Sequence, residues 1–316
     1  MTRWTTSDIP PQNGRTALVT GTGGLGLEDA IALARAGAEV IIAGRNARKG
    51  ADAVARVRKE VARATVRFER LDLADLGSVA DCAERVGRQI DRLDLLVNNA
   101  AVMVPPQRQT TKDGFELQLG TNHLGHFALT AHLLPLLRQS RVARVVSVSS
   151  IAAARGAIDF GDLNAEQSYK PMTSYAQSKL ANLLFALELD RRSAAQGWGI
   201  TSIAAHPGIS RTDLIINGAG PNSLEGRIRS WLPFLFQPAE RGALPTLFAA
   251  TSPDARAGGY YGPDGIGGIR GYPAVSKTPP LARDEAVAAR LWTLSEELTG
   301  VRFDTAQENR ALALAS

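Results

Sequence analysis

The feature that most constrains the fold is the alternation of short β-branched runs with longer helical stretches, which begins near residue 16. Such alternation is typical of a parallel sheet that helices cover on both faces. The apolar runs lack a strict polar alternation, as expected for strands buried on both sides. The sequence therefore predicts an α/β fold with a doubly wound parallel sheet. Strands are expected at 16–20, 38–44, 65–70, 93–99, 143–150 and 199–205.

The length of 316 residues allows two domains, but the pattern favours a single domain over 14–303. Residues 1–13 are then an N-terminal extension, and 304–316 form a C-terminal tail that is expected to fray. The glycine- and proline-rich stretch 258–280 is predicted to be an irregular loop that follows a last short strand.

Composition excludes several functional classes. The chain is 44% hydrophobic and 21% charged, which is ordinary for a soluble globular protein. Its net charge of +5 comes from arginines spread along the chain, so no nucleic-acid partner is predicted. The only cysteine, Cys82, excludes an intrachain disulfide and favours a reducing compartment, so a cytoplasmic location is expected. No apolar run reaches the roughly 18 residues of a spanning helix, which argues against stable membrane insertion.

A glycine-rich turn joins the first strand to the first helix. Gly21, Gly23 and Gly26 have the G-x-G-x-x-G spacing of a dinucleotide-binding turn. Glycines let the backbone approach a pyrophosphate closely, and a helix that begins near Leu25 offers free N–H groups at its positive end. The sequence therefore predicts cofactor contacts from this turn; a tight turn without a ligand is the alternative. The predicted residues are Gly21, Gly23, Gly24, Leu25 and Gly26.

The end of the second strand bears on the choice of cofactor. An enzyme that uses NAD carries Asp or Glu there for the ribose hydroxyls, whereas an arginine suits the 2′-phosphate of NADP. The residue here is Arg45, and Arg48 and Lys49 follow it. We therefore predict NADP(H) as the cofactor. NAD remains possible, and a solvated basic helix start is the alternative for Arg45.

Further motifs follow the later strands in a fixed order. They are Leu71-Asp72-Leu73, Asn98-Asn99-Ala100-Ala101, Ser149-Ser150, Tyr175-x-x-x-Lys179 and Pro207-Gly208-x-x-x-Thr212. With them the chain resembles the classical short-chain dehydrogenase/reductase family over roughly residues 14–300. The long 151–174 spacing resembles the retinol-dehydrogenase-like and protochlorophyllide-reductase-like branch. The resemblance implies a Rossmann-type fold and an NAD(P)-dependent oxidoreductase.

Two departures from the family pattern stand out. The family's T-G-x-x-x-G-x-G turn is one residue short in Thr20-Gly21-Thr22-Gly23-Gly24-Leu25-Gly26, so the roles of Gly23 and Gly24 could exchange. Ala101 replaces the glycine of N-N-A-G. These departures are the only support for a rival function, a non-catalytic protein that senses a dinucleotide.

The resemblance assigns further cofactor contacts. Asp72, with Leu73 beside it, would bind the adenine. The motif that begins at Asn98 would steady the sheet beside the cofactor through Asn99 and Ala100. Pro207, Gly208 and Thr212 would contact the nicotinamide carboxamide; for Thr212 a plain helix cap is the alternative.

Tyr175 and Lys179 lie four residues apart, on one face of a predicted helix. A free phenol has a pKa of about 10, and a nearby ammonium favours its phenolate. We therefore predict that Tyr175 is the acid/base and that Lys179, with a bound nicotinamide, lowers its pKa. By the resemblance, Ser150 rather than Ser149 polarises the substrate oxygen, and Asn122 anchors a proton relay. No metal site is predicted, because His123 and His126 lack further ligands nearby.

The substrate side is less determined. The 151–174 insertion contains Arg155, Phe160 and Asp162, and an apolar run at 231–236 suggests a lid at about 209–240 over a pocket for a lipophilic carbonyl or alcohol. Ordinary core packing and contact with a membrane surface are the alternatives for the lid. A homodimer or homotetramer is expected on the helices of 115–138 and 175–192, because their apolar content exceeds what one core face needs. The sequence thus predicts a carbonyl reductase or alcohol dehydrogenase.

Overall fold

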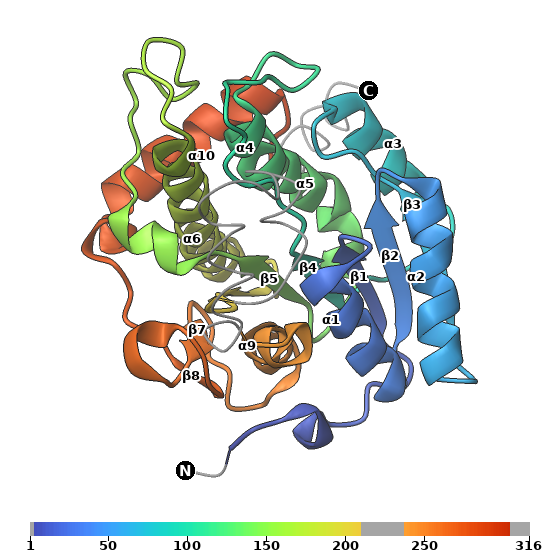
Figure 1. Ribbon diagram of the computed structural model, residues 1–316. Helices are drawn as coiled ribbons and strands as arrows, with labels where there is room; N and C mark the ends of the chain where they lie inside the picture. Colours follow the sequence, from blue (N-terminus) through green and yellow to red (C-terminus); the bar gives the residue numbers. More distant parts are fainter. Residues whose placement is uncertain (1–2, 210–236, 304–316) are drawn as a thin grey trace.

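The computed structural model describes residues 3–209 and 237–303. Its centre is an eight-stranded sheet with the order β3-β2-β1-β4-β5-β6-β7-β8 (Figure 1). The strands β1 to β7 run parallel and β8 pairs antiparallel to β7. The strand bounds are β1 Thr16–Thr20, β2 Glu39–Gly44, β3 Val66–Arg70, β4 Leu95–Asn98, β5 Arg144–Val148, β6 Thr201–Ala205, β7 Tyr260–Pro263 and β8 Pro273–Val275. The doubly wound, single-domain fold is therefore confirmed.

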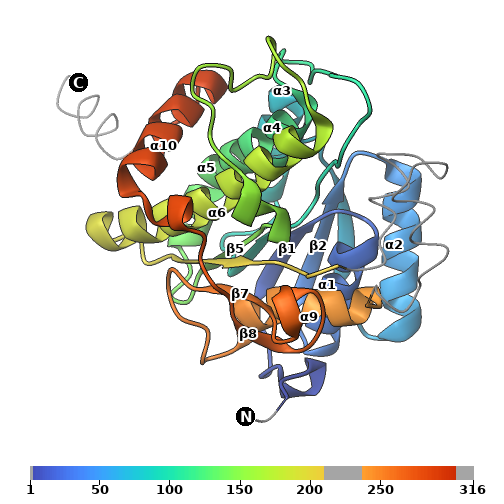
Figure 2. The same ribbon diagram turned by 60° about the vertical axis from the view of Figure 1, so that its left-hand side comes forward.

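Helices cover both faces of this sheet. Figure 2 shows α5 and α6 on one side and α1 and α9 on the other. Their bounds are α1 Gly24–Arg35, α2 Ala47–Glu60, α3 Leu76–Gly87, α4 Leu117–Leu119, α5 Gly125–Arg138, α6 Pro171–Gln196, α9 Ala239–Thr251 and α10 Glu285–Thr299. A π-helical stretch, Gly120–Leu124, joins α4 to α5, and four short 3-10 turns lie at Thr6–Asp8, Ile151–Arg155, Ile266–Gly268 and Pro280–Arg283.

Local chemistry explains where the helices that frame the site begin and end. The Asn46 side chain accepts the Lys49 N–H (3.0 Å) and caps α2. Pro171 occupies the first turn of α6, where its missing N–H costs nothing, and Gly197 ends that helix with φ 66°. The long helix that carries Tyr175 is thereby defined at both ends.

The core forms two apolar layers, one on each face of the sheet. Neighbouring strand residues alternate between them, as Leu18 and Val19 do on β1. Both layers are buried, which explains why the strands read as continuous apolar runs.

The stretch 258–280 corrects one prediction, because it contains β7 and β8 and is not an irregular loop. The strands were not predicted because glycine is unusual inside a strand and typical of loops. A Cβ on Gly262 would lie 1.9 Å from Nε2 of His206, so close packing and not a turn requires that glycine. Glycine in a strand can mark such an approach of neighbouring atoms.

The apolar surplus of α5 and α6 has an explanation within one chain. Helix α10 packs against α6, and its Trp292 joins Phe127 of α5, Phe185 of α6 and Phe303 in one aromatic cluster. The ring centroids of Trp292 and Phe303 are 4.4 Å apart. The surplus is therefore no argument for a homo-oligomer, and the oligomeric state stays a prediction.

Candidate active site

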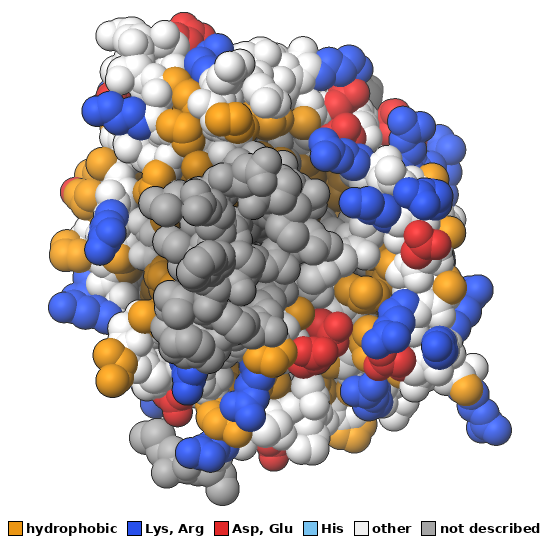
Figure 3. Space-filling view, viewed as in Figure 1, with side chains coloured by type: hydrophobic (Ala, Val, Ile, Leu, Met, Phe, Trp, Pro, Cys, Tyr) orange, Lys and Arg blue, Asp and Glu red, His pale blue; other side chains and the backbone are white. Residues whose placement is uncertain are grey.

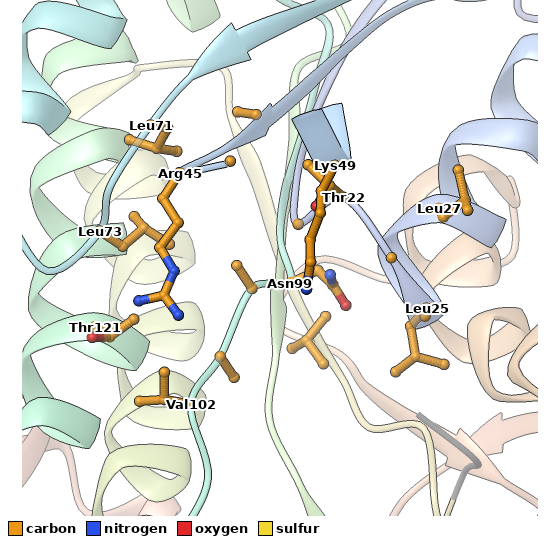
Figure 4. Close-up of a pocket in the computed structure, with 18 of the residues that line it drawn as sticks. Thr22, Leu25, Leu27, Arg45, Lys49, Leu71, Leu73, Asn99, Val102 and Thr121 are labelled. Carbon is orange, nitrogen blue, oxygen red and sulfur yellow. The ribbon is translucent and has the colours of Figure 1, made fainter. Parts of the chain in front are cut away.

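One cavity of about 670 Å³ lies beyond the carboxyl ends of the strands, where doubly wound sheets bind ligands. Figure 4 shows its walls, to which the first turn, the end of β2 and the segment after β4 contribute. Twelve predicted site residues line it: Gly21, Gly23, Gly24, Leu25, Arg45, Asp72, Leu73, Asn99, Ala100, Tyr175, Lys179 and Pro207. Gly26, Asn122, Ser150 and Gly208 lie outside its lining. Thr212 and most of the predicted lid fall in 210–236, beyond the described residues.

The shortened glycine turn forms a cradle open to the cavity. Gly21 and Gly24 have φ values of 106° and 54°, which favour glycine, and no heavy atom of residues 3–209 or 237–303 lies within 4 Å of a Cβ placed on Gly23. Gly24 thus takes the strained position and Gly23 the open one. Helix α1 begins at Gly24 without a side-chain cap. Its first N–H groups are therefore available to a phosphate, so the turn fits a dinucleotide.

Gly26 packs the helix against the turn. A Cβ there would lie 2.5 Å from Nδ2 of Asn99 and 3.0 Å from the Gly21 carbonyl oxygen. Asn99 in turn donates to the carbonyl of Thr20 (2.8 Å), and the Thr20 hydroxyl accepts the N–H groups of Asn99 and Ala100 (2.9 Å each). These bonds tie the ends of β1 and β4 together beneath the cradle.

Basic side chains surround the cavity at the end of β2. Arg45 and Lys49 project into it (Figure 4). Arg56, further along α2, also lines it. Figure 3 shows Lys and Arg side chains gathered over α2 and β3 at this end. Lys49 and Arg56 were missed as site residues, although their spacing of seven residues on α2, about two helical turns, places them on one face of that helix. Asp52 is the one acidic side chain that lines the cavity on α2.

Tyr175 and Lys179 lie at the opposite end of the cavity, on α6. Both are buried, with 6% and 2% of their surfaces exposed. The Lys179 Nζ donates to the Val148 carbonyl (3.1 Å) and lies 5.9 Å from the centroid of the Tyr175 ring. Burial lowers the pKa of Lys179 to about 7 and raises the pKa of Tyr175 to about 12.

These values describe the chain alone, so the expectation that Lys179 lowers the pKa of Tyr175 together with a bound nicotinamide stays a prediction. Within the chain itself burial dominates, because removal of water penalises both the ammonium and the phenolate. An interaction with the Ser150 side chain opposes part of the rise at Tyr175. Within the chain alone, burial therefore favours the protonated form of Tyr175.

The two adjacent serines face different ways. The Ser149 hydroxyl donates to the Lys179 carbonyl inside α6 (2.7 Å), although Ser149 also lines the cavity. Ser150 instead interacts through its side chain with Tyr175, and its hydroxyl accepts the Ala152 N–H (3.2 Å). Ser150 is therefore the serine whose side chain interacts with Tyr175, and its role toward a substrate oxygen stays a prediction.

Asn122 lies in the π-helical stretch before α5 and is fully buried. Its side chain accepts the Val102 N–H (2.8 Å) and donates to the Val102 carbonyl and to the Ser178 hydroxyl (3.0 Å each). Asn122 therefore joins the segment after β4 to α6. Single π-helical turns are frequent at functional sites.

Other candidate residues have structural partners. Asp162 accepts the N–H groups of residues 166–168, and Phe160 stacks under Arg290 with 4.0 Å between the guanidinium carbon and the ring centroid. These residues of the insertion order its loop and do not line the cavity, and neither does Arg155.

The two neighbouring histidines are also held within the core. His123 hydrogen-bonds to Ser295, and His126 to Thr20 and to the Asn122 carbonyl (2.9 Å each). Their rings therefore serve packing and hydrogen bonding between elements.

The family follows from a match over most of the fold. The profile described as short chain dehydrogenase matches residues 15–219, which includes the glycine turn, the cavity walls and α6. The chain belongs to the short-chain dehydrogenase family. As such, it is an oxidoreductase that acts on CH–OH or C=O groups with a nicotinamide cofactor.

Similar proteins place this short-chain dehydrogenase in the retinol-dehydrogenase-like branch. It is 40% identical to retinol dehydrogenase 13 of Mus musculus over 311 residues, 95% of this chain and 88% of that protein. It is 41% identical to polyprenol dehydrogenase of Mus musculus over 299 residues, 92% of this chain and 86% of that protein.

Solved structures agree on the fold of the short-chain dehydrogenase. A protein from Mycobacterium paratuberculosis has 40% identity and a TM-score of 0.79 over 96% of this chain and 99% of its own. The complex of RhlG from Pseudomonas aeruginosa with NADP has 25% identity and a TM-score of 0.63 over 79% of this chain and 94% of its own.

Proposed function

We propose that the protein is an NADP(H)-dependent carbonyl reductase or alcohol dehydrogenase for lipophilic substrates. The observation that carries the cofactor choice is the group of three cations, Arg45, Lys49 and Arg56, that lines the cavity at the end of β2. Arg45 occupies the position at which an NAD enzyme carries an acid, and a 2′-phosphate suits such cations. Asp52, the acidic residue on this wall, supports the alternative of NAD.

Two kinds of relatives support the remaining parts of the proposal. The names retinol dehydrogenase and polyprenol dehydrogenase describe enzymes for lipophilic alcohols. A structure of a short chain dehydrogenase from Shigella flexneri, 25% identical, holds NADP, as the RhlG complex does. A lipophilic aldehyde, ketone or alcohol is therefore the proposed substrate class. The relatives' names favour an enzyme over a dinucleotide sensor.

The nicotinamide cofactor supplies the hydride when bound. In carbonyl reduction, the neutral Tyr175 hydroxyl gives its proton to the substrate oxygen, and the Ser150 hydroxyl donates a hydrogen bond to that oxygen as negative charge develops. Lys179, held at the Val148 carbonyl, then stabilises the phenolate that remains. Asn122 holds the segment after β4 against α6 and is the fourth residue of the proposed catalytic group, with Ser150, Tyr175 and Lys179.

Location and assembly rest on the sequence. No helix among residues 3–209 and 237–303 is long and apolar enough to cross a membrane. The cytoplasmic location, for which the sequence argument was the lone cysteine Cys82, stays a prediction, as does a homodimer or homotetramer.

Calorimetric titration with NADPH and with NADH, in the same salt, tests the cofactor choice. We expect NADPH to bind at least tenfold more tightly, about 1.4 kcal/mol. Turnover of all-trans-retinal with NADPH then tests the substrate class. Tighter binding of NADH would overturn the NADP assignment, and binding without turnover of any lipophilic carbonyl would overturn the reductase assignment.

A further inference from the structure

The segment after β4 passes the cavity in a strained conformation. Val102 lines the cavity with Tyr175 and Thr121 (Figure 4), and two residues later Val104 has a φ of 53°. A β-branched residue in the left-handed region is an outlier, and the position before a proline disfavours helical conformations further. Such strain persists only where the surroundings impose it, and it is concentrated at functional sites.

Two buried amides, one helical turn apart, hold this segment. The Oε1 of Gln118 accepts the Val104 N–H (2.7 Å), while the Asn122 side chain pairs with both backbone groups of Val102. Gln118 is 0% exposed, so its bonds are formed out of water. Its Nε2 donates to the Pro171 carbonyl (3.0 Å). Gln118 therefore connects the strained residue to the first residue of α6.

Tyr169 holds the next residue of the segment. Its hydroxyl donates to the Pro105 carbonyl (2.7 Å), and it also lies 3.5 Å from Nε2 of Gln118. Burial raises the pKa of Tyr169 to about 12, so the hydroxyl keeps its proton at neutral pH. Proline has no N–H, so this carbonyl is the one backbone group through which the segment can be held at Pro105.

We propose that Gln118 and Tyr169 are positioning residues that keep Val104 strained and so hold Val102 at a set distance from Tyr175, as the wall of the space for the substrate. The inference rests on the proposed function. Pro171 lies four residues before Tyr175 on α6. Through its bond to Pro171, Gln118 therefore also fixes the position of this wall relative to the helix that carries Tyr175. Neither residue lines the cavity, so each acts through the backbone that it holds.

The hydrogen bonds of Gln118 to Val104 and of Tyr169 to Pro105 together form a clamp on this segment. Loss of either bond would let Val104 relax toward negative φ and move Val102. A large rigid substrate depends on this wall, whereas a small flexible one does not. Tyr169→Phe removes one hydroxyl, and we expect it to raise the KM for all-trans-retinal about fivefold. The KM for hexanal, the kcat for either aldehyde and the Kd for NADPH should change less than twofold. The matched control is Tyr261→Phe, which removes a buried hydroxyl that accepts the Arg256 N–H (2.8 Å) away from the cavity.

A double-mutant cycle tests the role of strain directly. Glycine adopts a φ of 53° freely, so in a Val104→Gly background the segment needs no clamp. There we expect Tyr169→Phe to change the KM for retinal less than twofold. An equal effect in both backgrounds, or an equal change for retinal and hexanal, would overturn the inference.

Amide hydrogen exchange over 101–108 gives a readout that does not need turnover. We expect faster exchange in Tyr169→Phe than in the wild type and in Tyr261→Phe. Unchanged exchange would overturn the inference. A wild-type protein that reduces neither aldehyde would instead refute the proposed function, and the exchange result would still decide the inference.

Discussion

The two ends of the cavity differ in how the protein treats its charged groups. At the α6 end, Tyr175 and Lys179 are buried, and burial shifts both pKa values toward the neutral forms. At the end of β2, Arg45 and Lys49 are exposed to solvent. Arg45 lies just before α2, and Lys49 lies in the first turn of that helix. In the proposed function, proton transfer therefore depends on buried groups, whereas the choice of cofactor depends on solvated charges.

This contrast has a consequence for substitution. A change at the α6 end disturbs a network that includes the Val148 and Lys179 carbonyls, Ser149 and Asn122. A change at the β2 end alters a local electrostatic attraction that salt also weakens. The effects of mutations should therefore fall in size from the buried end to the exposed end.

Tyr175→Phe tests the buried end and has the largest expected effect. The substitution keeps the ring and removes the proton that the substrate oxygen needs. We expect kcat/KM for retinal reduction to fall by about 10²- to 10⁴-fold, the range typical of a lost general acid. The Kd for NADPH, measured by calorimetry, should stay within twofold of the wild-type value. Full turnover by this variant would contradict the difference drawn between the two ends of the cavity, because the burial of Tyr175 would then serve packing alone.

Asp29 tests whether burial dominates elsewhere around the glycine turn. This side chain of α1 is 0% exposed, and neither of its carboxylate oxygens has a hydrogen-bond partner among the residues that the structure describes. Burial, with a smaller effect from Glu28, raises its pKa well above the usual value. We expect Asp29→Asn to increase the free energy of unfolding at pH 8 by about 1–3 kcal/mol, because it removes an unpaired buried acid.

The pH dependence gives this prediction its sign. The folded protein holds the Asp29 proton more tightly than the unfolded chain, so stability from this group is complete below the unfolded pKa and is lost as pH rises through the folded pKa. Urea unfolding of both proteins should show a difference at pH 8 that shrinks toward pH 4. A difference that stays constant with pH would mean that Asp29 does not change protonation on unfolding.

Arg45→Ala tests the exposed end and has the smallest expected effect. We expect about a fivefold weaker Kd for NADPH and little change for NADH, because only NADPH has the 2′-phosphate. Arg48→Ala is the matched control, since Arg48 lies in the first turn of α2, three residues after Arg45, and is exposed but does not line the cavity. The difference should diminish in high salt. Equal losses for NADPH and NADH, or for both variants, would show that Arg45 does not recognise the phosphate.

Sequence alone determined the layers of the fold and most of the cavity. The alternation of strands and helices predicted a parallel sheet, and the carboxyl ends of parallel strands meet at one edge for geometric reasons. Residues just after the strands, such as Gly21, Arg45 and Asn99, therefore had to come together, and they line the same cavity. The spacing of Tyr175 and Lys179 likewise required only a helix.

Tertiary structure decided what depends on burial and on contacts between distant segments. The strands β7 and β8 form because Gly262 allows close approach to His206, and α10 covers an apolar surface that composition had suggested for a partner subunit. The burial of Tyr175 and Lys179, which shifts the pKa of each toward its neutral form, could not be predicted from their spacing. The hydrogen bonds of Gln118 to Val104 and of Tyr169 to Pro105 join residues that are 14 and 64 positions apart in sequence. Local pattern carries no information on such contacts, because side-chain burial and hydrogen-bond partners are set only when the segments pack together.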